Sequence, residues 1–215
     1  MEQYFPYGEK EVVYLKNKDK RLAKVINKVG MVKRRVIPDL FAALVHSIVG
    51  QQISTKAHET IWRKMMGTLG EVTPEKLLGL LPEELQAFGI TFKKVSYIWS
   101  VAQNIASDEF DIRALRTMSD TEDCVKLSEL DGISVWTSEM MILHSLQRPD
   151  VLSFGNLAVQ RGLRTLYHHR KITRPIREIS LSLRSLRQCR LHLSLGGVGR
   201  CDRGFERLCT EREKR

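Results

Sequence analysis

Between residues 38 and 170 the apolar residues recur at helical spacing in short segments, and residues that cap or stop helices separate these segments. Asp39, Ser54 and Thr73 each precede such a segment and are suitable N-cap residues, because their side-chain oxygens can accept hydrogen bonds from free backbone N–H groups. No period-two alternation of useful length interrupts this region. The sequence therefore predicts an all-α fold of short helices joined by tight loops, with any strand at the edges.

The N-terminal segment 9–30 has the same periodicity and ends at Gly30, which indicates an amphipathic helix or a pair of helices. Of the 215 residues, 42% are hydrophobic, which is enough for a sizeable core. This composition excludes a chain that is disordered throughout.

The chain is basic, with 35 Lys and Arg residues against 25 Asp and Glu residues and a net charge of +10. This balance excludes an acidic solvating protein and indicates either a polyanionic partner or a solvated surface. Residues 176–215 contain nine Arg, one Lys and five acidic residues, a net of +5, so half of the excess comes from this tail. The total charge therefore does not decide between the two interpretations.

The N-terminus lacks the basic-then-apolar order of a secretory signal, and the apolar stretches are far shorter than the roughly 18 residues that a bilayer needs. We expect an intracellular, cytoplasmic monomer without membrane association. The four cysteines show no C-x-x-C spacing, so we expect free thiols. His46, His58 and His144 lie on predicted helices without metal-ligand spacing, and we expect satisfied or exposed imidazoles.

Residues 126–146, KLSELDGISVWTSEMMILHSL, contain the turn that is most informative about function. Two helices are predicted there, joined by a Leu-x-Gly-Ile turn, with the second helix starting at Trp136 and Thr137. The N-terminus of that helix presents a row of backbone N–H groups at its positive end, an arrangement that suits a phosphate group. Taken alone, the segment is equally typical of an ordinary pair of packed antiparallel helices.

Three further segments are informative through their order and spacing relative to this turn: 45–58 (VHSIVGQQISTKAH), 89–98 (GITFKKVSYI) and 149–163 (PDVLSFGNLAVQRGL). With 130–143 (LDGISVWTSEMMIL) they make the chain resemble the 3-methyladenine DNA glycosylase II type of the helix-hairpin-helix base-excision glycosylases. The resemblance implies a helix-hairpin-helix glycosylase domain over residues 1–175, with the hairpin at about 122–147.

The resemblance also implies roles for individual residues. The hairpin turn would hold a structural monovalent cation through main-chain carbonyls, and its amides would grip a DNA phosphate. The loop at 51–53 would fill the gap left by an extruded nucleotide, with Gln52 as the plug, although the loop alone reads as an ordinary helix connection. Trp136 would form an aromatic wall of the base pocket together with Met140, although core packing would explain Trp136 alone. The implied cation ligands are Ser128, Leu130 and Ile133, and the implied DNA-binding residues are Gln51, Gln52, Ile53, Ser54, Gly132, Ile133, Ser134, Trp136 and Thr137.

The activity implied by the resemblance is base-excision DNA repair by hydrolysis of the N-glycosidic bond of alkylated purines flipped out of double-stranded DNA. An alkylated purine is cationic, so an indole face can prefer it to a neutral base through a cation–π interaction. Bifunctional lyases of the superfamily carry a Lys at the start of the second hairpin helix, where this chain has Trp136. A monofunctional DNA-3-methyladenine glycosylase is therefore implied, with no cofactor or metal for catalysis.

Two positions depart from the family pattern. Asn156, in the stretch SFGNLA, occupies the position of the family's essential Asp and cannot become an anion. Asn156 therefore raises an alternative, a catalytically silent lesion-binding or pseudogene product. Ser134 stands where the family favours Gly, which is expected to restrict a turn that often needs positive φ.

Residues 176–215 do not resemble the C-terminal helices of the family. Suitable codons for residues 176–211, read one base out of phase, give a stretch similar to those helices, which favours a frameshift near Pro175. The alternative is a genuine basic arm that binds phosphates without specificity. If the shift is real, the tail is aberrant and is expected to pack poorly.

Overall fold

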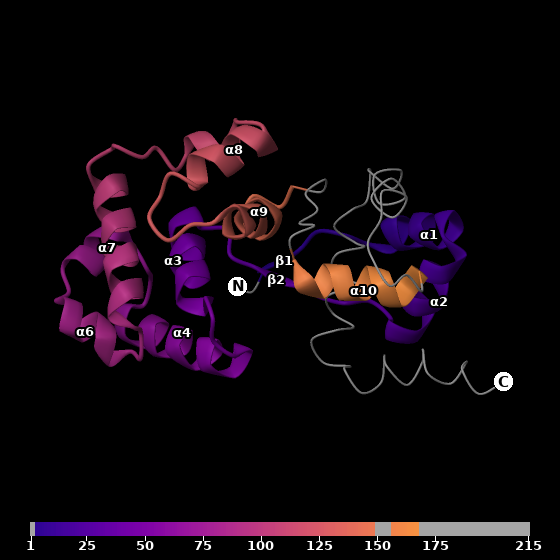
Figure 1. Cartoon of the computed structure of the whole chain (residues 1–215), viewed down its shortest axis with the longest axis horizontal. Helices are drawn as coiled ribbons and strands as arrows, with labels where there is room; N and C mark the ends of the chain where they lie inside the picture. Colours follow the sequence, from indigo (N-terminus) through magenta and orange to yellow (C-terminus); the bar gives the residue numbers. More distant parts are fainter. Residues whose placement is uncertain (1–2, 149–155, 168–215) are drawn as a thin grey trace. The chain divides into compact units, whose positions relative to one another are not determined.

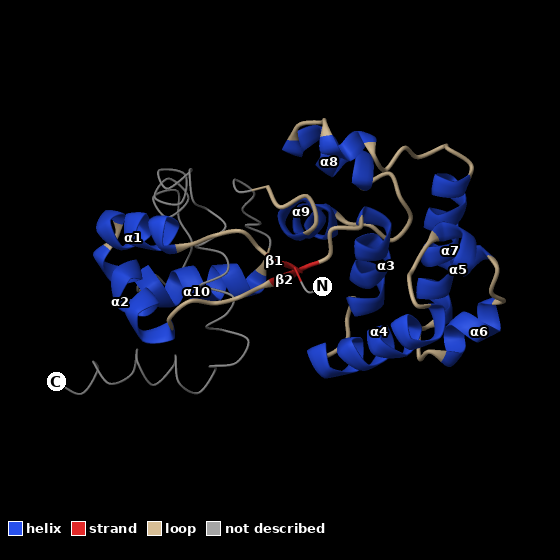
Figure 2. Cartoon of the chain, turned by 180° about the vertical axis from the view of Figure 1, so that it is seen from behind, coloured by secondary structure: helices blue, strands red, loops and turns tan. Residues whose placement is uncertain are grey.

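The computed structural model describes residues 3–148 and 156–167 of the chain. Within these residues the secondary structure is mostly helical (Figures 1 and 2), which confirms the predicted all-α class. The helices are α1 (Glu9–Lys18), α2 (Lys20–Val29), α3 (Leu40–Gly50), α4 (Thr55–Leu69), α5 (Pro74–Leu78), α6 (Pro82–Ala87), α7 (Phe92–Ala106), α8 (Asp120–Leu127), α9 (Val135–His144) and α10 (Leu157–Tyr167), with a 3-10 turn at Ala114–Arg116. No helix in the described ranges is long and apolar enough to cross a membrane.

The chain forms two compact units, one from Met1–Val36 with Gln147–Arg215 and the other from Ile37–Leu146. In the first unit, β1 (Gln3–Tyr4) and β2 (Arg35–Val36) pair antiparallel, with Gln3 opposite Val36. This two-residue ribbon lies outside residues 38–170, for which the sequence predicts helices.

A helix pair, rather than a single helix, forms the N-terminal part of the first unit. Asp19 breaks the segment because its carboxylate accepts hydrogen bonds from the N–H groups of Arg21 and Leu22 and so caps α2. The Tyr167 hydroxyl at the end of α10 also donates to the Asp19 carboxylate. Leu15, Leu22 and Ile26 are buried together in the small core of this unit, with Leu166 of α10 packed against them.

The second unit is built around α3, which packs against α4, α7 and α9 (Figure 1). Eight of its eleven residues are buried, as expected for a helix that is apolar on nearly every side. Its start agrees with the sequence prediction, because the Asp39 carboxylate accepts a 2.7 Å hydrogen bond from the N–H of Ala42. Ser54 and Thr73 cap α4 and α5 in the same way. The predictions for residues 176–215, including the frameshift, the basic arm and the boundary at 175, concern a region outside the described residues.

Candidate nucleic-acid interface

The predicted hairpin consists of α8 and α9, which contact each other and are joined by residues 128–134. Leu130 and Ile133 are buried and anchor the turn, whereas Asp131 and Ser134 are exposed. Val135 and Trp136, in the first turn of α9, have exposed fractions of 59% and 45%. The first N–H groups of a helix have no intrahelical partner, so this exposed end of α9 can receive an anion.

Ser134 does not restrict the turn, contrary to the sequence expectation. Its φ is −84°, an ordinary value for a non-glycine residue, and the positive φ of the turn, +77°, falls on Gly132. The Ser134 hydroxyl accepts a 3.3 Å hydrogen bond from the Thr137 N–H and so caps α9. Serine at this position therefore stabilises the start of the second hairpin helix.

Gly132 lies directly against the Tyr97 ring of α7. A Cβ atom built on Gly132 would lie 2.3 Å from Cδ2 of Tyr97, far inside van der Waals contact. The next turn of α7 holds the same hairpin segment, because the Ser100 hydroxyl donates to the Asp131 carboxylate at 2.9 Å. These contacts fix the hairpin turn on α7.

We expect a Gly132→Ala substitution to lower the free energy of unfolding by about 2 kcal/mol, because the new methyl group meets the Tyr97 ring at an already strained positive φ. Urea denaturation measures the change. Gly67→Ala is the matched control, because Gly67 is exposed within α4 and an added Cβ meets no atom within 4 Å. That control should stabilise the protein by about 0.5 kcal/mol. Equal effects of the two substitutions would contradict the assigned packing.

The loop that follows α3 has two glutamines in different environments. The Gln51 side chain is half-buried, and its Nε2 donates a 2.8 Å hydrogen bond to the carbonyl oxygen of Gly132. Gln52 is exposed and has a φ of +55°, a conformation that non-glycine residues rarely adopt. Gln51 therefore ties the loop to the hairpin turn, whereas Gln52 is exposed to solvent.

Lys94 of α7 holds the same loop from the other side. Its ammonium group donates hydrogen bonds to the carbonyl oxygens of Val49, at 2.8 Å, and of Gln51, at 2.6 Å. Desolvation lowers the pKa of Lys94 from its usual value. The loop, the hairpin turn and α7 are therefore connected by direct contacts within one compact unit.

The other predicted site residues on α9 and in the loop differ in exposure. Met140, one turn after Trp136, is partly exposed and lies on the same face of α9. Thr137 is buried, so its side chain is not available to DNA, although its N–H belongs to the capped helix start. Ile53 is partly exposed, and Ser54 is exposed and caps α4.

The implied cation ligands lie in the turn between α8 and α9. The Leu130 carbonyl oxygen accepts a 3.1 Å hydrogen bond from the Ile133 N–H. A carbonyl oxygen has a second lone pair, so that bond leaves room for a cation. Coordination by the carbonyls of Ser128, Leu130 and Ile133 stays a prediction from the resemblance.

Asn156 belongs to the first compact unit, whereas the hairpin belongs to the second. It directly precedes α10, and its side-chain Oδ1 accepts a 3.4 Å hydrogen bond from the Val159 N–H. The Asn156 backbone carbonyl accepts a second bond, from the Gln160 N–H at 3.0 Å. Asn156 is thus the N-cap residue of α10.

Three histidines that are not adjacent in sequence, His46, His58 and His144, interact in the second unit. The rings of His46 on α3 and His58 on α4 have centroids 4.0 Å apart, and Trp62 meets His46 edge-on at 4.8 Å. Burial, followed by the neighbouring His58 and His144, lowers the pKa of His46 to about 3. In the part of the chain that the structure describes, no cluster of His, Cys, Asp and Glu residues could hold a metal ion.

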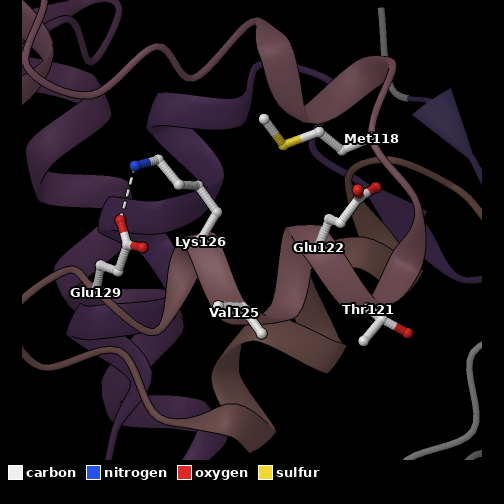
Figure 3. A pocket seen from close by; sticks show the side chains of 6 residues that line it. All are labelled: Met118, Thr121, Glu122, Val125, Lys126 and Glu129. Atoms are coloured by element: carbon white, nitrogen blue, oxygen red, sulfur yellow. Dashed lines mark hydrogen bonds and ion pairs between the residues drawn. The ribbon is translucent and has the colours of Figure 1, made fainter.

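A surface groove runs along α8 of the hairpin (Figure 3). Its lining residues are Met118, Thr121, Glu122, Val125, Lys126 and Glu129. Lys126 and Glu129 form an ion pair at 2.7 Å, and the Glu122 carboxylate accepts a 2.8 Å hydrogen bond from the Ser119 N–H. These charged groups serve local contacts, so we do not assign the groove to the DNA-binding site.

The family model described as the HhH-GPD superfamily of base excision DNA repair proteins matches residues 45–186, more than half of the chain. This chain belongs to the HhH-GPD superfamily. The matched region contains the loop, the hairpin and Asn156. The resemblance identified from the four sequence motifs is therefore confirmed.

Named relatives of this HhH-GPD chain include DNA-3-methyladenine glycosylase 1 of Schizosaccharomyces pombe, which is 27% identical over 157 residues, covering 71% of this chain and 69% of that protein. A DNA-3-methyladenine glycosylase of Bacillus subtilis is 28% identical over 159 residues, covering 67% of this chain and 52% of that protein. The chain thus spans about half the length of the Bacillus subtilis relative. A solved structure of a DNA-3-methyladenine glycosidase from Bacillus halodurans superposes with a TM-score of 0.75 at 29% identity, covering 97% of this chain and 99% of that chain.

Two residues that shape the interface of this HhH-GPD protein, Lys94 and Tyr97, have no role in the sequence analysis. The sequence does contain a sign that Lys94 is unusual, because residues 94, 98, 101 and 105 have the spacing of one helix face and the last three are apolar. In the structure Ile98 and Val101 on this face are fully buried. A lysine at the end of an apolar stripe has to find acceptors for its ammonium group. No comparable signal identifies Tyr97.

Proposed function

We propose that this chain binds double-stranded DNA that contains alkylated bases and hydrolyses the N-glycosidic bond of a flipped-out alkylated purine of the 3-methyladenine type. The hydrogen bond from Gln51 to the Gly132 carbonyl carries the proposal, because it joins the two elements expected to meet DNA, the loop and the hairpin turn, within one unit. The relatives named above as DNA-3-methyladenine glycosylases or glycosidase supply the substrate class. Membership of the HhH-GPD superfamily of base excision DNA repair proteins supports a role in that repair pathway.

In this proposal the hairpin turn binds the DNA backbone. The exposed N–H groups at the start of α9 bind a phosphate next to the lesion, assisted by the positive end of the helix dipole. Gln52, exposed at positive φ, enters the gap that the extruded nucleotide leaves. Trp136 and Met140 then provide a polarizable surface for the cationic purine.

Asn156 is expected to make the proposed hydrolysis slow. The resemblance aligns Asn156 with the family's Asp, and a neutral amide neither balances charge on an oxocarbenium-like sugar nor accepts a proton from water. Loss of a general base typically costs a factor of about 10²–10⁴ in rate. Asn156 therefore favours a second candidate function, binding of lesions without base release.

Trp136 occupies the position where bifunctional relatives carry a Lys, so we propose no Schiff-base step. A monovalent cation at the hairpin turn would have a structural role and would lower the cost of bringing a phosphate close. We further propose that the chain acts on DNA as an intracellular monomer.

Two measurements on the full chain test the proposed function. The first is the equilibrium affinity for a duplex with one tetrahydrofuran abasic analogue and for the matched undamaged duplex. The second is release of 3-methyladenine from methylated DNA, quantified by chromatography. We expect tighter binding to the abasic duplex together with slow base release. Abasic preference without any release would support the lesion-binding candidate, and no preference between the duplexes would contradict both functions.

A further inference from the structure

The C-terminal end of α3 receives its positive charge from another helix. The last turn of α3 contains no basic residue, although the carbonyl groups at a helix C-terminus carry partial negative charge. Lys94 supplies the missing cation from α7 by donating to the carbonyl oxygens of Val49 and Gln51 at 2.8 and 2.6 Å. Val49 is the second-last residue of α3 and Gln51 is its C-cap. The lysine therefore bridges the end of the helix and the first residue of the loop.

The loop held by Lys94 is bonded in turn to the hairpin. The backbone carbonyl of Gln51 accepts from Lys94, while the side chain of the same residue donates to the Gly132 carbonyl at 2.8 Å. Three residues further along α7, the Tyr97 ring lies against Gly132. Lys94 and Tyr97 thus fix the loop and the hairpin turn to one helix, so the distance between these two elements cannot change without breaking contacts to α7.

We propose that Lys94 is a positioning residue for nucleotide flipping: it sets the reach of Gln52 relative to the phosphate-binding N-terminus of α9. The inference rests on the proposed function, because it assigns Lys94 a part in the same lesion recognition. Without the two carbonyl contacts the loop would sample several conformations. The entropy lost when the loop becomes ordered upon insertion would then reduce the affinity for a duplex in which one base is missing or extruded.

Direct phosphate binding by Lys94 is the competing explanation. Two of the three donors of the ammonium group already bind the carbonyl oxygens of Val49 and Gln51, and the side chain is only partly exposed. The neighbouring Lys93 is exposed, and its ammonium group lies 5.8 Å from the centre of the Tyr97 ring. Lys93 is therefore better placed than Lys94 to meet a phosphate, and the two lysines form a matched pair for an experiment.

The experiment compares Lys94→Met with Lys93→Met, which removes the same charge one residue away. The probes are a duplex with one tetrahydrofuran abasic analogue and the matched undamaged duplex, each titrated over a range of salt concentrations. We expect Lys94→Met to lower the ratio of abasic to undamaged affinity about tenfold, in line with the loss of charge-assisted hydrogen bonds. The slope of log affinity against log salt should stay unchanged, since no phosphate contact is lost. Lys94→Arg, which can donate to both carbonyls, should restore most of the ratio.

Lys93→Met should leave the affinity ratio at its original value, whatever it does to both affinities together. A Lys94→Met protein that keeps the full affinity ratio would overturn the proposal. If that protein also binds both duplexes more weakly and its salt slope is smaller by about one, the result would favour phosphate binding by Lys94 instead. Gln51→Ala provides a second variant should Lys94→Met not fold. It breaks the bond to Gly132 from the loop side and should lower the same ratio. In the double variant the effects should be less than additive, because both contacts hold one loop, and full additivity would also count against the proposal.

The outcome also separates this inference from the proposed function. If the unsubstituted chain prefers the abasic duplex and Lys94→Met does so equally, the role of Lys94 is wrong and the proposed function stands. If the unsubstituted chain shows no preference, both are wrong.

Discussion

The Asn156→Asp variant is expected to release 3-methyladenine from methylated DNA at least about 100-fold faster than the unsubstituted chain. A carboxylate at this position can stabilise the positive charge that develops on the sugar and can accept a proton from the attacking water. The measurement is single-turnover base release with the protein in excess over DNA. Under these conditions the observed rate reports the chemical step rather than product release.

The substitution should be structurally mild, because Asp and Asn are equally good N-cap residues. Asn156 Oδ1 accepts from the Val159 N–H at the start of α10, and a carboxylate oxygen accepts in the same way. A negative charge at a helix N-terminus is also favourable. Thermal denaturation of the Asn156→Asp protein should therefore occur at the same temperature as that of the unsubstituted chain or slightly above it.

Asn156→Ala is the control for this prediction. It removes the cap and should destabilise the protein by about 1 kcal/mol without any gain in base release. If Asn156→Asp folds, binds the abasic duplex and yet releases no base above the unsubstituted rate, the assignment of Asn156 to the catalytic position is wrong.

Acidification is expected to destabilise the protein through His46. Burial, with smaller contributions from His58 and His144, lowers the pKa of His46 to about 3, whereas an unfolded chain restores it to about 6.5. Between these two values the unfolded state binds a proton that the folded state does not, so the free energy of unfolding falls as the pH falls. The loss between pH 7.5 and pH 4.5 is about 3 kcal/mol. The pKa of His58 is also lowered by burial, which acts in the same direction.

Urea denaturation at pH 7.5 and pH 4.5 measures this loss, and His46→Gln is the control because glutamine does not titrate. The variant is less stable at neutral pH if it packs poorly, but its stability should depend much less on pH than that of the unsubstituted chain. An equal pH dependence in both proteins would show that other groups are responsible.

Helix boundaries were the part of the fold most accessible from sequence, because they follow from local chemistry. Asp39, Ser54 and Thr73 have the side chains that caps need, and each caps the helix that follows. Gly30 ends α2 at positive φ as predicted. The alternatives left open for residues 9–30 were resolved by Asp19, which is itself a good N-cap residue within an otherwise helical pattern.

The site was less accessible, because its geometry depends on contacts between residues far apart in sequence. Gln51 and Gly132 are separated by 81 positions, and no local pattern links them. The Ser134 expectation was wrong for a related reason: the turn places its positive φ on Gly132, where Tyr97 leaves no room for a side chain. His46 and His58 do not have the spacing of metal ligands, yet the packing of α3 on α4 brings their ring centroids within 4.0 Å at an interplanar angle of 46°.

The interrupted connectivity of the first unit has a consequence for synthesis on the ribosome. Residues 37–146 are continuous in sequence and can fold as soon as they emerge from the ribosome. The first unit, in contrast, needs a contact between the Tyr167 hydroxyl and Asp19, which are 148 positions apart in sequence. Until α10 has left the exit tunnel, the apolar faces of α1 and α2 lack the Leu166 side chain that helps to cover them. The unit that contains α1 and α2 is therefore completed only after α3 to α9 have emerged, although α1 and α2 precede those helices in sequence.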